Sequence, residues 1–540
     1  MEINTIKKLE KKALKSSGFD FMRLGIALIF IVIVMFYTMA TTGNISNSMF
    51  LVVATIFGAY MAMNIGANDV ANNVGPAVGS KALSLGGAIL IAAIFEVSGA
   101  LIAGADVTNT IRKGIIDLNA FSNVNVFIWA MMAALLAAAV WLNLATYFKA
   151  PVSTTHSIVG GVMGAGIASG GFGIVHWATM GKIAASWVIS PVLGGLIAAL
   201  FLFSIKKTII FQDDKIQAAR KWVPVFVAIM AWAFTTYLTL KGLKHVWSDI
   251  TDILSFLPHT KKPTFGVASI FGIIIAIITF ILVKANITKK AQTLENNRNA
   301  INILFTIPLV FAAILLSFAH GANDVANAVG PLAAINDAVI NGGISAKSGI
   351  PLWVMAIGGF GIAVGLALYG PKLIKTVGSE ITELDQIRAF SIALAAAITV
   401  IIASQLGLPV SSTHIAVGAV FGVGFLREFM KLEKDNEEMI KKDLEKAEEL
   451  LKIMVIELDE LERKENKEKE DYENIVSLYE KIDGQEKIVK RLRKILKKEE
   501  KEEYVKRDML KKIVAAWIIT VPVAGLFSAI IFFVIKGMML

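Results

Sequence analysis

The feature that most constrains this chain is a polar string that occurs twice, each time inside long apolar sequence. Residues Gly66–Pro76 read GANDVANNVGP, and residues Gly321–Pro331 read GANDVANAVGP. An aspartate at the centre of a membrane helix costs roughly 2.5 to 3.5 kcal/mol unless it faces a partner or a cavity. Because the string recurs at matching places, it indicates a binding site.

A second motif is duplicated in the same order. Pro151–His156 reads PVSTTH and Pro409–His414 reads PVSSTH, and each copy follows the first motif of its half. Ala184–Gly194 also resembles Ala515–Gly525. The chain is therefore expected to contain two copies of one unit. Matching polar interruptions in two apolar halves are typical of secondary transporters, which hold substrate and coupling ions between the repeats.

Composition, the duplicated motifs and the charges of the loops together predict an all-α polytopic membrane protein with two inverted repeats, broken or re-entrant helices and about 12 to 13 spans. Hydrophobic residues make up 55% of the chain, and its mean hydropathy is +0.65. The expected spans are 24–41, 49–64, 84–104, 126–148, 152–171, 183–204, 222–241, 265–284, 300–319, 350–370, 386–406, 409–426 and 513–535. The absence of cysteine excludes disulfides and thiolate metal sites. No cleavable signal peptide is expected, because the first apolar span is long.

Basic residues in short loops predict the orientation of the chain. They are dense before the first span, so we place the N-terminus in the cytoplasm and the uncharged loop 43–48 outside. The basic residues that fall outside on this count are Arg112, Lys113, Lys241 and Lys244. The two GANDVAN units then enter the membrane from opposite sides. We therefore expect inverted repeats, an extracellular C-terminus and a multi-pass protein of the plasma membrane.

These observations divide the chain into seven segments. They are a cytoplasmic N-terminal segment (1–23), an extra first span and loop (24–48), repeat 1 (49–205), a connecting segment with two spans (206–298), the first part of repeat 2 (299–426), a charged insertion (427–512) and the last span of repeat 2 (513–540).

The insertion is rich in Lys and Glu. Apolar residues recur in it at spacings of three and four, as in LLKIMVIELDEL and IVKRLRKILKK, which predicts amphipathic helices. We expect a cytoplasmic hairpin of two long helices over 431–512 that turns near Asp483 and Gly484 and offers a surface to a regulatory partner. The alternative is a solvated charged linker that is only partly helical.

Both repeated motifs place Gly or Pro beside short polar side chains. We therefore expect the helix to break at each motif and to expose backbone groups to a cavity or a ligand. The hydroxyl residues of PVS[ST]TH follow a proline where a new helix would begin, and a helix N-terminus favours an oxyanion. The oxygens of GANDVAN suit hard cations, and Asn can serve either ion.

The two aspartates narrow the substrate. A carboxylate repels an anion unless a cation neutralises it or the anion donates a proton to it, and hydrogen phosphate has such a proton whereas sulfate does not. We expect Na+ or H+ to enter with phosphate, since neither motif contains Lys or Arg. The candidate phosphate ligands are Asp69, Asn72, Ser153, Thr154, Thr155, Asp324, Asn327, Ser411, Ser412 and Thr413. The candidate cation ligands are Asn68, Asp69, Glu96, Asn323 and Asp324, with Na+ possible at Asn68 and Asn323.

The doubled GANDVAN and PVS[ST]TH strings, together with Ser80 and the IFE of Ile94–Glu96, resemble the inorganic phosphate transporter (PiT) family. The resemblance covers nearly the whole chain except the first span and the insertion. It implies uptake of inorganic phosphate with Na+ or H+, an inverted-repeat fold, a homodimer and a site built from the Asp, Asn, Ser and Thr of these motifs. The halves differ, because Glu96 has no acidic counterpart in span 350–370 and Ile65 stands where the second copy has His320.

Other functions are open to the same sequence. Some PiT relatives transport sulfate, so a sulfate permease is the first alternative. An anion channel uses similar half-helices, but paired buried acids fit cation binding better. A membrane scaffold acting through 431–512 needs far fewer spans. Neither an enzyme nor a cofactor is expected without a nucleotide, metal or nucleophile motif, and the net charge of +10 is assigned to cytoplasmic loops and anionic lipid rather than to nucleic acid.

Overall fold

The computed structural model describes residues 3–43, 45, 47–121, 123–148, 152–244, 246–254, 257–344, 349–380, 384–430, 432–464, 468–499 and 507–540. The chain forms two compact units. One contains Met1–Val423 with Arg507–Leu540, and the other contains Gly424–Lys506. The described residues form helices joined by loops and no strand beyond one isolated bridge, which confirms the predicted fold class.

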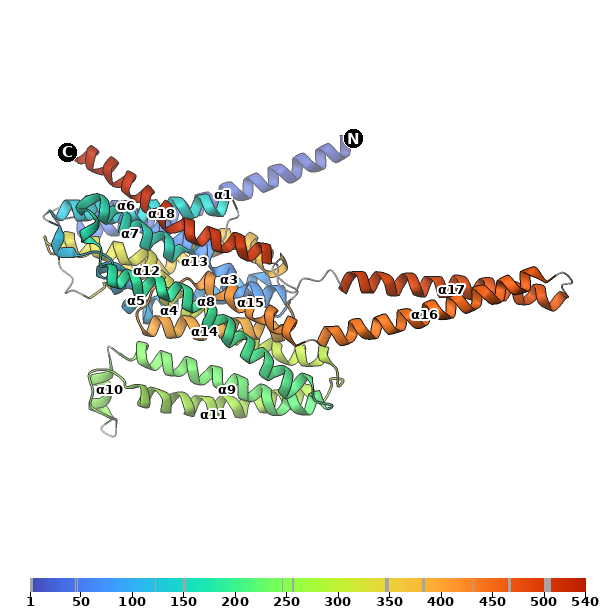
Figure 1. Cartoon of the computed structure of the whole chain (residues 1–540). Coiled ribbons are helices and arrows are strands. Elements are labelled where there is room, and N and C mark those ends of the chain that lie inside the picture. The colour runs from blue at the N-terminus through green and yellow to red at the C-terminus, as the bar shows by residue number, and fades with distance from the viewer. Residues whose placement is uncertain are drawn as a thin grey trace. The chain divides into compact units, whose positions relative to one another are not determined.

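The longer helices of the bundle follow the predicted spans (Figure 1). The helices of the bundle are α1 (Ile3–Thr42), α2 (Ser48–Asn68), α3 (Val70–Gly79), α4 (Leu85–Ala103), α5 (Ala105–Lys113), α6 (Val124–Tyr147), α7 (Thr154–Gly170), α8 (Trp177–Ile205), α9 (Lys215–Gly242), α10 (Trp247–Ile253), α11 (Phe265–Ala291), α12 (Arg298–Ile340), α13 (Leu352–Glu380), α14 (Gln386–Gln405), α15 (Ser412–Phe429) and α18 (Arg507–Met539). Among them, α3, α5 and α10 are additional short helices outside the predicted spans.

Eleven described helical segments are long and apolar enough to cross a membrane, which confirms a multi-pass membrane protein. They cover all but two of the predicted spans. The exceptions, 152–171 and 409–426, correspond to the shorter helices α7 and α15. Their first residues, Thr154 and Ser412, are only 1% and 3% exposed. These two helices therefore begin inside the bundle, as re-entrant helices do, where other protein groups can satisfy their free backbone amides.

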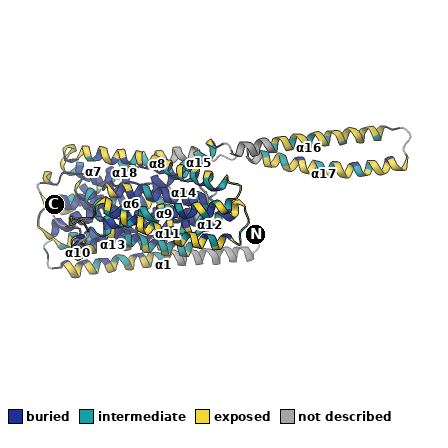
Figure 2. Cartoon of the chain, turned by 90° about the horizontal axis from the view of Figure 1, so that it is seen from below, coloured by how far each residue is buried: buried dark blue, intermediate teal, exposed yellow. Residues whose placement is uncertain are grey.

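Apolar side chains cover the outside of the bundle. On α11, for example, Ile274, Ile277, Ile281 and Leu282 are all exposed, and exposed residues follow the outer helices in Figure 2. The interior instead contains buried Asp, Asn, Ser, Thr and His side chains. An apolar exterior around a polar interior suits a bundle that faces lipid and encloses a binding site.

The two halves pack on each other reciprocally. A Cβ atom on Gly66 of α2 would collide with the backbone oxygen of Ile362 on α13. Likewise, a Cβ atom on Gly321 of α12 would collide with the backbone oxygen of Glu96 on α4. Glycine at these two positions lets the helix backbones touch. The reciprocal crossings make Ile362 and Glu96 equivalent positions in the two halves.

The last helix of each half packs against the opposite half. α18 lies against α6 and α7, and α8 lies against α14. Backbones meet closely where Gly164 faces Gly525 and where Gly422 faces Gly195. These contacts make Gly195 the counterpart of Gly525. The sequence match aligns Gly194 with Gly525, whereas the helix contacts align Gly195 with Gly525. The structural alignment of the two copies is therefore shifted by one residue from the alignment by sequence, because it is determined by backbone packing.

The expected helix break at GANDVAN occurs in the first copy only. There α2 ends at Asn68 and α3 begins at Val70, although Asp69 keeps right-handed helical angles of φ −91° and ψ −32°. In the second copy α12 continues through Gly321–Pro331, so the prediction of a break is wrong there. The glycine serves a helix crossing, and neighbouring helices can compensate for the hydrogen bond that the proline of a membrane helix removes.

The second unit is a pair of helices, as predicted for the insertion. They are α16 (Leu432–Arg463) and α17 (Lys469–Glu499), and they bury Ala447, Leu478 and Val489. The amphipathic periodicity of the sequence accounts for this pairing, since each helix has one apolar stripe to cover. The described part of the insertion therefore favours the hairpin over the charged linker.

The turn of the hairpin does not lie at Asp483 and Gly484. α17 runs through both residues, and the connection between the helices falls between Arg463 and Lys469. A glycine inside a helix costs only about 1 kcal/mol relative to alanine, and Asp483 pairs with Lys487 one turn later. A long helix tolerates this cost, so the predicted turn position is wrong.

Candidate functional site

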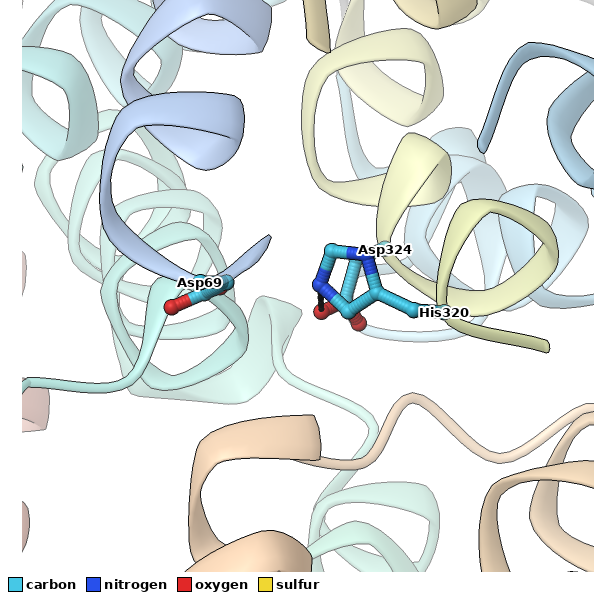
Figure 3. A group of neighbouring side chains, drawn as sticks. All are labelled: Asp69, His320 and Asp324. Atoms are coloured by element: carbon cyan, nitrogen blue, oxygen red, sulfur yellow. Dashed lines mark ion pairs between the residues drawn. The ribbon is translucent and has the colours of Figure 1, made fainter. Parts of the chain in front are cut away.

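The aspartates of the two GANDVAN motifs lie in one buried cluster with a histidine (Figure 3). Asp69 comes from the junction of α2 and α3, whereas His320 and Asp324 stand one turn apart on α12. One ligand atom from each of the three side chains lies within 4.8 Å of the others. The three residues are at most 1% exposed. Both halves of the sequence thus contribute to one site.

Both oxygens of Asp69 accept hydrogen bonds from threonine hydroxyls. Thr154 Oγ1, from the first half, donates to Oδ2 at 2.6 Å, and Thr413 Oγ1, from the second half, donates to Oδ1 at 3.0 Å. Asn72 Nδ2, one turn along α3, donates to Thr413 Oγ1 at 2.9 Å. Asp69 therefore joins the two PVS[ST]TH motifs.

Asp324 has partners from its own half. Ser412 Oγ donates to Asp324 Oδ2 at 2.8 Å, and His320 Nε2 lies 2.7 Å from the same oxygen. The other oxygen, Oδ1, is buried and has no hydrogen-bond partner among the described residues. The amide oxygen of Asn327, one turn later, is also buried and has no hydrogen-bond partner among the described residues. α12 thus carries two unpaired acceptor oxygens at the site.

Asparagine amides connect the GANDVAN and PVS[ST]TH motifs. Asn327 Nδ2 donates across the halves to Thr154 Oγ1 at 3.2 Å and Thr155 Oγ1 at 3.1 Å. Asn68 donates to the backbone carbonyl of Val152, just before α7, at 3.2 Å. Asn323 donates to the backbone carbonyl of Leu408, just before α15, also at 3.2 Å. Every candidate Asn of the two GANDVAN motifs therefore reaches the PVS[ST]TH segments.

Each PVS[ST]TH motif starts a helix, as predicted from the sequence, although Pro151 lies outside the described residues. Ser153 Oγ accepts from the backbone N–H of His156 at 3.1 Å, and Ser411 Oγ accepts from that of His414 at 3.3 Å. Both serines thus cap their helices. A capping hydroxyl still has its own proton to donate, so capping is compatible with binding an anion.

The histidines that end the two motifs form a cluster of four aromatic rings with two tryptophans. The ring centroids of His156 and Trp187 are 3.8 Å apart, and those of His414 and Trp517 are 3.5 Å apart. The two imidazoles are 4.5 Å apart and nearly perpendicular. These ring contacts give both histidines a packing role where α7 and α15 begin.

Glu96 reaches the cluster through His320. Glu96 Oε2 lies 2.7 Å from His320 Nδ1, and Glu96 Oε1 accepts from Asn73 Nδ2 at 2.8 Å. The imidazole therefore links Glu96 to Asp324, with a carboxylate at each ring nitrogen. Sequence analysis nominates Glu96 but not His320. The sequence feature that could have pointed to His320 is the difference between the two copies at this position, where the first copy has Ile65.

The cluster contains three acidic side chains and one basic side chain. In the described part of the chain, neither Lys nor Arg forms an ion pair with Asp69, Glu96 or Asp324. Carboxylate, amide and hydroxyl oxygens are ligands that hard cations prefer, and the unpaired buried oxygens of Asp324 and Asn327 fit such an ion. A cation here would offset the negative charge that opposes an anion.

Known phosphate transporters match most of this chain. The family described as "Phosphate transporter family" matches residues 65–528, which include all four motifs. A Helicobacter pylori (strain J99) protein named "Putative phosphate permease" is 48% identical over 545 residues, covering 98% of each chain. The Arabidopsis thaliana protein "Inorganic phosphate transporter 2-1, chloroplastic" is 39% identical over 398 residues, covering 69% of this chain and 65% of that protein.

The fold is similar to that of a solved structure. "The sodium-dependent phosphate transporter" aligns with a TM-score of 0.70 and 30% sequence identity, covering 91% of this chain and 99% of that one. The family match and the structural match extend over both repeats and the site between them. The chain therefore belongs to the phosphate transporter family.

Proposed function

We propose that this protein imports inorganic phosphate by symport with Na+ or H+, through alternating access between the two inverted repeats. The observation that carries the proposal is the buried cluster in which Asp69 accepts hydrogen bonds from hydroxyls of both PVS[ST]TH motifs and Asp324 accepts one from the second motif. Hydroxyls donate to an oxyanion, whereas carboxylates repel it, so the anion needs a cation beside it. The solved sodium-dependent relative supports Na+ as that cation.

The roles of the side chains follow from their chemistry. We assign phosphate to the hydroxyl and amide donors at the starts of α7 and α15 together with Oδ1 of Asp324, and the cation to the other carboxylate and amide oxygens of GANDVAN. The unpaired Oδ1 of Asp324 supports hydrogen phosphate over sulfate, because this oxygen can accept the proton that only hydrogen phosphate offers. Glu96 acts on the site through His320.

Uptake of radiolabelled phosphate into proteoliposomes tests this function. A Na+ gradient and a pH gradient are imposed separately, with excess sulfate as competitor. We expect one gradient to drive uptake, sulfate to leave it unchanged and Asp69→Asn to abolish it. Asp213→Asn, at an exposed loop position, is the matched control.

Each other outcome selects a different function. Uptake abolished by sulfate would make the protein a sulfate permease, and uptake that needs no gradient would indicate a channel. No uptake under any condition would favour the scaffold. We also propose a homodimer in the plasma membrane, with the 431–512 hairpin in the cytoplasm as the surface for a regulatory partner. Crosslinking of the protein in native membranes checks the dimer.

A further inference from the structure

Asp324 is held in place by a base. His320 Nε2 lies 2.7 Å from Asp324 Oδ2. On the other side of the ring, His320 Nδ1 lies 2.7 Å from Glu96 Oε2, and Glu96 Oε1 accepts a hydrogen bond from Asn73. The imidazole is fully buried, and a carboxylate oxygen lies within ion-pair distance of each of its nitrogens. Movement of Asp324 away from His320 would separate a buried carboxylate from its base, which is costly in a membrane interior.

Asp69 has no comparable support. The positions equivalent to His320 and Glu96 are occupied by Ile65 and Ile362, both apolar and fully buried. The His320 ring lies within 4.8 Å of Asp69 but forms no ion pair with it, and the hydrogen-bond donors to the Asp69 carboxylate among the described residues are neutral hydroxyls. Hydrogen bonds between a carboxylate and neutral groups are weaker than those with an ionised partner, so Asp69 is the carboxylate that can change partners.

The hydroxyls that hold Asp69 are the ones that a phosphate requires. A hydroxyl has a single proton to donate, and both Thr154 and Thr413 donate theirs to Asp69. The carboxylate and a phosphate oxygen therefore compete for the same two donors. Because these donors come from opposite halves of the chain, Asp69 also forms a bridge between the halves.

We propose that Asp69 is the exchangeable carboxylate of the site: a cation bound to Asp69 withdraws it from Thr154 and Thr413 and releases both hydroxyls for phosphate, while Asp324 stays in place. The inference rests on the proposed function and adds an order of binding, with the cation first and phosphate second. The released bond to Thr413 crosses between the halves, so the same cation also loosens one contact that must change during alternating access.

Equilibrium binding of radiolabelled phosphate to the full chain in lipid nanodiscs tests this order. Na+ is varied against choline at fixed pH, and the pH is then varied without Na+. The native chain is expected to bind phosphate about tenfold or more tightly at saturating cation, because two hydroxyl donors become available. Asp69→Asn is expected to bind phosphate with one affinity at all cation concentrations, although coupled uptake is lost.

Asp324→Asn is the matched control for this measurement. It is expected to bind phosphate more weakly than the native chain but to keep the dependence on the cation, since its Asp69 is intact. Asp69→Ala serves as a second variant, because alanine cannot accept the hydroxyl bonds at all. Thermal unfolding with the cation and without phosphate reports on folding. The cation is expected to stabilise the native chain and Asp324→Asn but neither Asp69 variant.

Two results would overturn the inference and leave phosphate symport standing. In the first, the phosphate affinity of Asp69→Asn still rises with the cation. In the second, both Asp69 variants fold but bind no phosphate, which would make Asp69 a phosphate ligand rather than a competitor. A native chain that neither binds nor takes up phosphate would instead reject the proposed function itself.

Discussion

At the residue scale, one exchange makes the two halves of the site unequal. His320 and Glu96 meet in one half, whereas Ile65 and Ile362 occupy the equivalent places in the other. All four side chains are fully buried. A buried ion pair and an apolar pair of similar bulk therefore fill corresponding positions in one fold. This equivalence can be tested by exchanging one pair for the other.

His320→Ile alone is expected to destabilise the protein strongly. It leaves the carboxylates of Asp324 and Glu96 buried without a base, and breaking a buried pair costs about 3–5 kcal/mol. The double variant with Glu96→Ile recreates the apolar pair and should regain the part of that loss that comes from Glu96, because apolar replacement of both partners is often neutral, while Asp324 keeps its bond from Ser412. Thermal unfolding in nanodiscs measures both variants, with Ile65→Val as control. Equal losses in the single and double variants would contradict the equivalence.

Sequence analysis reaches the members of the site more readily than their partners. Asp69, Asp324 and Glu96 are nominated because acids inside apolar spans are unusual. The contact between Glu96 and His320 spans 224 residues of sequence and depends on the crossing of α4 and α12. The bond from Thr413 to Asp69 likewise joins opposite halves. Neither contact has a local signature, so neither could be predicted from spacing.

At the element scale, the glycines of GANDVAN act through helix crossing. Gly and Pro at membrane depth predict a broken helix, yet α12 passes through the motif intact. Its Gly321 instead brings the backbone of α12 against the backbone of α4 at Glu96. A motif of this composition is compatible with both outcomes. Gly66 and Gly321 make the same kind of crossing, yet only the first copy breaks, so the glycine itself does not determine whether the helix is interrupted.

Gly321→Ala tests the crossing. The added methyl group would collide with a backbone carbonyl, which cannot rotate away as a side chain can. We expect a loss of about 1–3 kcal/mol or more, as in other overpacked interiors, together with reduced uptake, because α4 and α12 also carry Glu96 and Asp324. Folded yield and uptake are the measurements. Gly86→Ala on α4, whose added Cβ meets no atom within 4 Å, is the control. Equal behaviour of the two variants would refute the close crossing.

At the scale of the whole molecule, hydropathy predicts the spans well because each must satisfy the same length requirement. The hairpin is predicted from its periodicity, but its turn is not, since Gly484 lies inside α17. The hairpin has buried residues of its own, and the described site residues all lie in the other unit. Each unit thus has its own composition and its own buried residues.

Removal of the hairpin is expected to leave transport intact. Replacing residues 431–506 with a flexible Gly/Ser linker deletes a unit that packs on itself, so the remaining fold should keep uptake within about twofold of the native value. Uptake in proteoliposomes and size-exclusion chromatography measure activity and folding together. A folded, monodisperse variant without uptake would make the hairpin part of the transport cycle rather than a regulatory surface.

Membrane orientation is predicted from the basic residues of the loops. Three basic residues that fall on the predicted outer side, against the expected bias, form ion pairs in the structure. Arg112 pairs with the buried Asp337, and Lys241 and Lys244 both pair with Asp106. These residues therefore have a role in packing, which explains basic side chains on the side predicted to face outward. The prediction of an inside N-terminus can then stand on the other loops.

Single cysteines can test that orientation directly, because the native chain has none. Asn47→Cys lies in the loop predicted outside and Asp213→Cys in a loop predicted inside, both at exposed positions. A membrane-impermeant maleimide added to intact cells is expected to label the first variant, and to label the second only after permeabilisation. Met538→Cys, near the C-terminus, should behave like the first. The opposite pattern would invert the whole topology, and the ion pairs of Lys241 and Lys244 would then lie on the cytoplasmic side, where basic residues need no special explanation.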